Sequence, residues 1–373
     1  MTSKETPKVE YYYRTIQELI DNTKAPFSDP YNYWGAINHN KKEAFLNNIT
    51  GINPKEICQI IALVDGVAAG YLTLYTGYAL INNLKIKVQH GSDLYAHPKY
   101  RKLMIGAEML FLSRDLQQLP CIFAGLSEYA KPLYPKMGFK LFSFPRYVFL
   151  FRNRIIVEHS NKIPKFLKKP VSLMLDFLQG NTKIQAYKRI THLKRSFRVE
   201  HSDKIPTDIE TLIYSHSTPY QELHNQHWFH YVLNYTFEED KDESIRNKKI
   251  YLVKEKDKMI GFFVIRYRNS HVANGSWSNL RSAEIKEWES IDYDLLSEAD
   301  IYHLAIAEAK KERVDSVAFS VFYTNTENII GNKFKRQGTY DVAVYIPGKK
   351  KTDSIYERNN WRIRDGYSDT LID

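Results

Sequence analysis

A strand–turn–strand pattern in residues 58–81 constrains the fold of this chain more than any other feature. The segment CQIIALVDGVAAGYLTLYTGYALI is apolar and rich in β-branched side chains, and Asp65-Gly66 interrupts it. An Asp-Gly pair favours the two-residue turn of a β-hairpin, because both positions of that turn need positive φ. The segment NLKIKVQH then alternates with a period of two, which predicts a third strand. An antiparallel sheet is therefore expected.

The stretch from Ser92 onward predicts strands that alternate with helices. A short strand, SDLYA, turns at His97-Pro98 into a helix, MIGAEMLFLSRDLQQL, whose apolar residues share one face. A buried strand (CIFAGL), a short helix (SEYAKPLYPKM) and a strand pair around GFKLFSFPRYVFLF follow. Residues 1–155 therefore predict an α/β or α+β sheet flanked by helices.

Residues 200–350 resemble a second copy of this arrangement. Three pairs of residues match in the same order at offsets of 191, 194 and 200: Gly70 with Gly261, Trp34 with Trp228, and Gly138 with Gly338. We therefore predict two tandem domains, each a mixed, mostly antiparallel sheet flanked by helices. The predicted domains are residues 1–155 and 201–350, joined by a basic connector (156–200) and followed by a polar tail (351–373).

Composition excludes several classes of protein. The chain has 373 residues, of which 43% are hydrophobic and 26% charged, so it is not a disordered chain. It lacks an apolar run of about 18 residues, so no membrane-spanning helix is expected. The N-terminal MTSKETPKVEYYYRT has no apolar core of a secretory signal, so a cytoplasmic protein is expected. Two cysteines, Cys58 and Cys121, exclude a disulfide framework and a cysteine-built zinc site.

Metal ligation by histidines is not expected either. His224, His227 and His230 recur every third residue on a predicted helix, but Trp228 and Phe229 interleave them and no cysteine lies nearby. No metal cofactor is therefore predicted.

The basic charge of the chain is concentrated in one segment. Lys and Arg number 16 in residues 131–200, against 3 Asp and Glu, a net charge of +13 in a chain whose total is +10. Such a segment is either a solvated linker or a surface for an anionic partner. It contains an amphipathic helix near PVSLMLDFLQ, which either lies on a membrane or docks between the two domains.

The segment SDLYAHPKYRKLMIGAEML carries the clearest chemical signal. A strand ends, and a basic loop leads into a helix whose first N–H groups and dipole favour a phosphate. Lys99, Arg101 and Lys102 add positive charge, and Gly106 allows a ligand to approach the backbone closely.

Two motifs in this region resemble the GNAT acyltransferases. The first, HPKYRKLMIGAEML, is similar to the family's acetyl-CoA loop, Arg/Gln-x-x-Gly-x-Gly/Ala: Arg101 and Gly106 match, and Met104 replaces the first Gly. The second, Ser127 to Phe139, resembles the family's Asn-x-x-Ala-x-x-x-Tyr-x-x-x-Gly-Phe segment, with Ser127 in place of Asn. The resemblance covers residues 10–150 well and the second half only weakly.

This resemblance implies a cosubstrate, acetyl-CoA, and a set of site residues. The strand Leu94, Tyr95 and Ala96 would bind the pantetheine arm. The pyrophosphate would lie on the amides of Lys102, Leu103, Met104, Ile105, Gly106 and Ala107, near the charge of Arg101, and Lys131 is assigned to the same cofactor site. Tyr134 would protonate the leaving thiolate, and Asp93 is our candidate for the base that deprotonates the acceptor amine.

The second half departs from the motif. Its helix begins with an acidic corner, Ser297 to Asp300, which suits a helix N-terminus but repels a phosphate. We therefore predict that this half has no CoA site and closes one wall of the acceptor cleft.

The predicted function is transfer of acetyl from acetyl-CoA to an amine of a small molecule or amino sugar, by direct attack. Two alternatives remain: a Fem-type transferase that uses aminoacyl-tRNA, and a catalytically inactive binding module in which Met104 has closed the site. A nucleic-acid partner is expected only under the first alternative, since no helix-turn-helix or aromatic RNA-binding signature is present.

Overall fold

The structure is a computed structural model. It describes residues 7–37, 39–47, 51–116, 118–153, 157–158, 163–178, 180–213, 220–224, 228–229, 246–270, 280–330 and 334–363.

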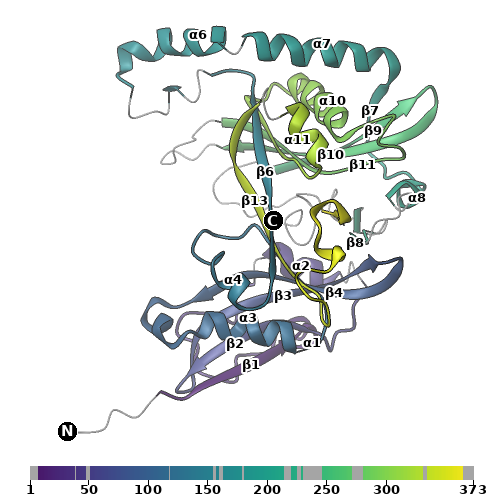
Figure 1. Ribbon diagram of the computed structural model, residues 1–373. Coiled ribbons are helices and arrows are strands. Elements are labelled where there is room, and N and C mark those ends of the chain that lie inside the picture. The colour runs from purple at the N-terminus through teal and green to yellow at the C-terminus, as the bar shows by residue number, and fades with distance from the viewer. Residues whose placement is uncertain are drawn as a thin grey trace.

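Within these residues, fourteen strands form one mixed, mostly antiparallel sheet that runs through the molecule (Figure 1). Their bounds are β1 Val9–Thr15, β2 Ile57–Val64, β3 Val67–Ile81, β4 Leu84–Ala96, β5 Cys121–Ala124, β6 Lys140–Leu150, β7 Arg198–Ser202, β8 Tyr220–Glu222, β9 Arg246–Glu255, β10 Lys258–Ser270, β11 Leu280–Ser290, β12 Ser316–Ser320, β13 Lys335–Tyr345 and β14 Trp361–Arg362.

Helices flank this sheet, as the sequence predicted. They are α1 Ile16–Ile20, α2 His39–Leu46, α3 Ile105–Asp115, α4 Leu133–Lys136, α6 Lys168–Leu178, α7 Gly180–Ser196, α8 Ile209–Ile213, α10 Glu298–Lys311 and α11 Thr324–Ile330, with short 3₁₀ turns at Pro98–Leu103 (η1), Lys165–Leu167 (η2), Ser354–Tyr356 (η3) and Arg358–Asn360 (η4). The predicted fold class is confirmed.

The predicted hairpin is present between β2 and β3. Asp65 and Gly66 turn the chain with φ of 51° and 76°, and Asn82 and Asn83 do the same between β3 and β4 with φ of 50° and 65°. These four residues adopt the left-handed conformation that Asn, Asp and Gly tolerate best. The register of the first three long strands therefore follows from local turn chemistry.

The sheet contains the same strand order twice. In the first half, β1 to β5 lie in sequence order, with β4 and β5 parallel and the other neighbours antiparallel. In the second half, β7, β9, β10, β11 and β12 repeat this order, and β11 and β12 are again the parallel pair. The predicted domain boundaries at 155, 200 and 350 remain a prediction, because the two halves share strands.

The sharing consists of an exchange of two strands. β13, from the end of the chain, lies between β5 and β6 and is antiparallel to both. β6, from the first half, lies between β13 and β12 of the second half. Figure 1 shows these two strands running together from one half of the molecule to the other. The halves therefore form one continuous sheet.

The structure supports one of the two predicted glycine matches between the halves and contradicts the other. A Cβ on Gly70 of β3 would lie 2.6 Å from the Tyr95 carbonyl, and one on Gly261 of β10 would lie 2.7 Å from the Glu289 carbonyl. Both strands therefore approach a neighbouring strand too closely for a side chain, which supports this match. The match of Gly138 with Gly338 is wrong: Gly138 precedes β6, whereas Gly338 lies inside β13 at a bulge.

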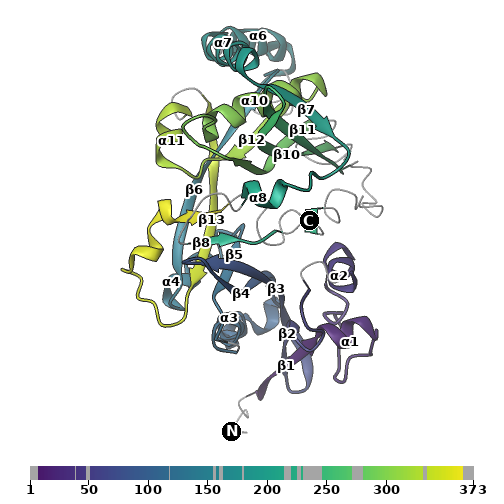
Figure 2. The same cartoon turned by 90° about the vertical axis from the view of Figure 1, so that its right-hand side faces the viewer.

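The cores lie on the faces of the sheet. In the first half, α3 packs on one face through Ile105, Met109 and Leu110, which are buried. In the second half, α10 is buried along most of its length, because the sheet covers one side and α7 lies close to it on the other. Figure 2 shows α7 and α6 at the end of the molecule, beyond α10.

Candidate functional site

The strands β4 and β5 diverge at the N-terminal end of α3. Their parallel pairing extends only over Gln89–Gly91 on β4 and Cys121–Phe123 on β5. Beyond it, β4 continues for five residues while β5 ends at Ala124. The edge of β4 from Ser92 to Ala96 therefore faces away from β3 without pairing to β5, and its backbone groups can bind an extended ligand as an added strand would.

A bulge at Asp93 redirects this end of β4. Asp93 has a φ of 52°, and the register with β3 shifts between Tyr71 and Thr73. A bulge inserts an extra residue and changes which face the following side chains occupy. As a result Leu94 packs in the core beneath α3, and Ala96 packs against Gly106 of that helix.

The loop after β4 ends in a left-handed residue that starts α3. His97 begins η1, where its Nδ1 accepts a hydrogen bond from the Lys99 amide at 3.2 Å. Met104 follows η1 with φ 57° and ψ 20°, and it is the N-terminal cap of α3 without a side-chain hydrogen bond. This conformation favours glycine, so Met104 occupies the position where the GNAT motif has Gly at a cost in backbone strain.

The left-handed cap leaves two amides of α3 available. The Met104 carbonyl accepts from Ala107 N–H at 2.9 Å and Glu108 N–H at 3.1 Å. The first four N–H groups of a helix have no partner within it, so those of Ile105 and Gly106 remain for a ligand. Arg101 is exposed beside them, and its Nε donates to the Ala96 carbonyl at 3.4 Å. Two free amides, a helix dipole and a cation suit a phosphate.

Tyr134 is buried on the same side of the sheet. It lies on α4, 3% exposed, and its ring packs at 5.1 Å from Phe123 of β5 and at 5.5 Å from Phe139. Burial raises the pKa of the Tyr134 hydroxyl above its usual range, so the group keeps its proton at neutral pH. Within the described residues no hydrogen bond of this hydroxyl is found, so it can donate to a bound molecule.

Asp93 has a cationic partner. The Lys41 Nζ, on α2, lies 2.9 Å from its carboxylate, and the side chain of Lys41 is 3% exposed. Beside this pair stand three tyrosines, Tyr33, Tyr71 and Tyr95, with ring centroids 5.5 to 6.0 Å apart. Sequence reasoning missed Lys41 and Tyr33, because neither belongs to a motif and both come from the segment between α1 and β2.

Lys131 forms an ion pair within the protein, and its role at the cofactor site remains a prediction. Its Nζ forms an ion pair of 2.9 Å with Asp341, a 3% exposed carboxylate on β13. Ser143 of β6 also donates to Asp341. The structure therefore gives Lys131 a contact that joins the loop after β5 to the exchanged strand.

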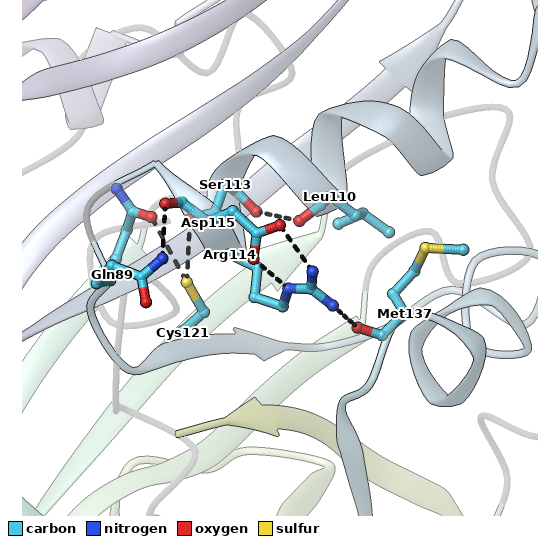
Figure 3. Close-up of polar contacts among 8 residues, drawn as sticks. Gln89, Leu110, Ser113, Arg114, Asp115, Cys121 and Met137 are labelled. Carbon is cyan, nitrogen blue, oxygen red and sulfur yellow. Dashed lines mark hydrogen bonds and ion pairs between the residues drawn. The ribbon is translucent and has the colours of Figure 1, made fainter. Parts of the chain in front are cut away.

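The far end of α3 is held by polar contacts (Figure 3). Arg114 donates to the Met137 carbonyl at 2.9 Å and pairs with Asp115, while Cys121 of β5 donates to the Ser113 carbonyl at 3.3 Å. The two cysteines are both free and buried, and burial raises the pKa of Cys121 to about 12, so Cys121 is a core residue. These contacts join α3 to β5 and to the end of α4, the helix that bears Tyr134.

The corresponding corner of the second half is closed by its own carboxylate. Glu298, the first residue of α10, accepts hydrogen bonds from the amides of Phe322 and Tyr323 at 2.9 and 3.1 Å, directly after β12. Asp300 accepts from Arg189 of α7 at 2.6 Å. Both carboxylates of this acidic corner are therefore engaged within the protein, and the absence of a CoA site from this half remains a prediction.

A buried polar cluster lies between the halves. Glu222 of β8 contacts His90 of β4 at 2.8 Å and His224 at 3.7 Å, and His224 contacts Glu287 of β11 at 3.4 Å. Burial alone would lower the pKa of His224, but Glu222 and Glu287 raise it to about 9. Burial would raise the pKa of Glu222, yet His90 and His224 hold it well below its usual range. His227 and His230 lie outside the described residues.

The comparisons with solved structures identify the fold. The chain is similar to a GCN5-related N-acetyltransferase from Anabaena variabilis, with a TM-score of 0.50 and 12% identity over 91% of this chain and 73% of that protein. It is also similar to two structures of Saccharomyces cerevisiae N-myristoyltransferase with bound myristoyl-CoA. Their TM-scores are 0.51 and 0.52 at 11% and 12% identity, over 93% and 94% of this chain and 86% and 82% of the yeast chain.

The chain has the GNAT fold. This confirms, for the fold, the resemblance that the two motifs carried. No protein-family model matches the sequence, and no curated protein matches it. Among the described residues, no helix is long and apolar enough to cross a membrane.

The conformation of Met104 generates a prediction. Replacing it by Gly removes left-handed strain of about 1–2 kcal/mol but adds backbone entropy in the unfolded chain of about 0.5–1 kcal/mol. Met104→Gly should therefore raise the melting temperature slightly, whereas Met104→Val, whose β-branched side chain resists positive φ, should lower it. Thermal unfolding of the three proteins measures this, and equal melting temperatures for Gly and Val would contradict the left-handed assignment.

The pKa of His224 predicts a dependence of stability on pH. Its folded value of about 9 lies above the ordinary 6.5, so its contribution is complete below pH 6.5 and is lost as the pH rises through 9. The melting temperature should therefore fall between these values. In His224→Asn the melting temperature should be lower at pH 6.5, because Glu222 and Glu287 lose a cation, and the fall toward pH 9 should be smaller. An unchanged slope in this variant would show that other groups cause it.

Proposed function

We propose that this chain is an acyl-CoA-dependent N-acyltransferase that moves acetyl from acetyl-CoA to an amine. The observation that carries the proposal is the juxtaposition of three elements at one opening in a GNAT fold. These are the unpaired edge of β4, the two available amides of Ile105 and Gly106, and the buried hydroxyl of Tyr134.

Acetyl-CoA would bind as an extended strand followed by a phosphate. The pantetheine arm would pair with the backbone of Leu94 to Ala96, and the pyrophosphate would lie on the start of α3 beside Arg101. Lys102, Leu103, Met104 and Ala107 would form the wall of this loop. Lys131 would act from the edge of the site while its ion pair with Asp341 fixes the loop after β5.

Direct transfer needs one proton removed and one supplied. The amine nitrogen attacks the thioester carbonyl, a C–N bond forms, and collapse of the tetrahedral intermediate breaks the C–S bond. Tyr134, which burial keeps protonated before this step, would give its proton to the departing thiolate. The amine proton would pass to Asp93, directly or through water, and Lys41 would stabilise the anionic carboxylate before it accepts that proton.

We infer a short acyl group from the packing at the last paired residue of β4. A Cβ on Gly91, the last β4 residue paired to β5, would overlap the Phe123 ring at 1.9 Å. The space beside the divergence on the α3 side is thus filled by an aromatic ring, which supports acetyl over myristoyl. The acceptor would approach from the side of Asp93, where Tyr33, Tyr71 and Tyr95 offer aromatic faces. A cytoplasmic location remains part of this proposal.

The first test is a calorimetric titration of the protein with acetyl-CoA and with myristoyl-CoA. Arg101→Glu should weaken binding of acetyl-CoA at least about tenfold, because it places an anion beside the pyrophosphate. Lys55→Glu, an equal change of charge at an exposed residue of another loop, should leave it unchanged. Absence of binding to the wild-type protein would refute the proposal and favour the tRNA-dependent or inactive alternatives.

The role of Tyr134 makes a kinetic prediction. Tyr134→Phe removes only the hydroxyl and should lower kcat about 100-fold, within the usual range for loss of a general acid, with little change in acetyl-CoA affinity. Tyr129→Phe is the matched control, since Tyr129 is 95% exposed in the preceding loop. A variant in which kcat is unaffected would assign proton delivery to another group.

A further inference from the structure

The helix α6 presents a stripe of large apolar side chains to solvent. Phe166 in η2 and Leu173, Met174, Phe177 and Leu178 in α6 are 61% to 85% exposed. Their spacing places them on one face. An ordinary surface helix turns such a face inward, and α6 lies at one end of the molecule rather than between the halves (Figure 2).

Specific contacts hold α6 in this orientation. Asp176 accepts hydrogen bonds from Asn153, just beyond β6, at 2.9 Å, and from Lys183 of α7 at 2.8 Å. Lys183 also donates to the Phe151 carbonyl at 3.2 Å, and Ser172 on the same side of α6 is 5% exposed. The inward side of the helix carries these polar contacts beside the half-buried Val171 and Leu175, and the apolar stripe cannot turn inward without breaking them.

The surroundings of the stripe are cationic. Residues 163–198 contain nine Lys and Arg and one acidic residue, the inward-facing Asp176. Lys165 and Lys169 are exposed beside the stripe. On α7, Lys188 and Arg195 line a shallow groove together with Ile184, Tyr187, Thr191 and His192. Figure 1 shows α6 and α7 end to end along one end of the molecule, and we call these two helices the ridge.

We propose that this ridge, α6 with α7, binds the surface of a membrane that contains anionic lipids. The apolar stripe enters the boundary between headgroups and acyl chains, as the apolar side of an interfacial helix does. The cations next to it contact anionic headgroups, and the groove on α7 holds the phosphate of one lipid. The binding is peripheral, and it is independent of the proposed acyl transfer.

Charge distinguishes a membrane from the other occupants of an apolar surface. In a symmetric dimer of this chain through the ridge, the same basic residues would face each other and repel. A nucleic acid would satisfy the cations but leave the Phe and Leu side chains in water. An anionic bilayer satisfies both the apolar stripe and the cations that border it.

Sedimentation of the full-length protein with vesicles tests the proposal. One set of vesicles is phosphatidylcholine alone, and in the other part of it is replaced by phosphatidylglycerol. The protein should partition to the second set more strongly, and added salt should weaken this preference. Failure of the wild-type protein to sediment with phosphatidylglycerol vesicles would overturn the proposal.

Two variants separate the apolar from the electrostatic contribution. The triple variant Leu173→Ser, Met174→Ser and Phe177→Ser should lower the partition coefficient at least about 100-fold. The reason is that three large apolar side chains are no longer transferred from water into the bilayer. Lys188→Gln with Arg195→Gln should lower it about tenfold or more on anionic vesicles only. Leu84→Ser, an exposed apolar residue (69%) at the opposite half, is the control and should partition like the wild type.

Further measurements keep these results interpretable. The triple variant should keep the melting temperature and acetyl-CoA affinity of the wild-type protein, because its three side chains are exposed and lie outside the proposed active site. If the triple variant sedimented with vesicles to the same extent as the wild type, the ridge would not be the surface that binds the membrane. A different result would be a wild-type protein that does not bind vesicles and elutes as a dimer in size-exclusion chromatography, with a triple variant that elutes as a monomer. The apolar stripe would then contact a second copy of the chain, and the proposal would be wrong.

Discussion

The backbone ladder between β6 and β13 is the interaction on which the rest of the structure depends. Each of these strands pairs on both of its sides, so each half of the sheet is completed by a strand from the other. The site in the first half is therefore supported from the far end of the sequence. The Gly125 amide, just after β5, donates to the Asp341 carbonyl of β13 at 3.0 Å, and Lys131 pairs with the carboxylate of the same residue. The position at which β5 ends, and hence the opening beside β4, is fixed by an exchanged strand.

Backbone conformation shapes this opening more than side-chain chemistry does. Asp93 and Met104, both non-glycine residues with positive φ, stand on either side of the segment proposed to hold the cosubstrate. The first forms a bulge that shifts the register of β4 against β3 and turns Leu94 toward the core, and the second starts α3 and leaves the amides of Ile105 and Gly106 available. Strained residues persist where the surrounding structure determines their conformation, and such residues concentrate at functional sites. At the corresponding corner of the second half, the cap residue of α10 is Ser297, which is extended (φ −71°, ψ 162°) rather than left-handed.

Local sequence patterns predicted the individual helices and strands. The pairing of strands that lie far apart in the sequence could not be predicted from them. Asp65-Gly66 determined a hairpin and its register because the turn needs only adjacent residues. In β13 the residues Lys335–Thr339 are exposed and Tyr340–Val344 are buried on both faces, and the sequence of this strand contains no information on which strands lie beside it. For that reason the exchange was not foreseen and Gly338 was matched wrongly. The cluster of His90, Glu222 and Glu287 could not be predicted either, since its members come from three strands that only the folded sheet brings together.

The orientation of α6 is a second feature that the sequence could not predict, and free energies show why it is unusual. Periodicity predicts that Phe166, Met174 and Phe177 share a face, but not whether that face points inward. Burying such a side chain is worth about 1.5–3 kcal/mol, whereas a hydrogen bond such as that of Asn153 to Asp176 contributes about 1 kcal/mol net. In water alone, we would therefore expect the apolar side of α6 to pack against the protein. An outward stripe bordered by lysines is consistent with these magnitudes only if a second apolar phase covers it, and an anionic bilayer supplies both that phase and the countercharge.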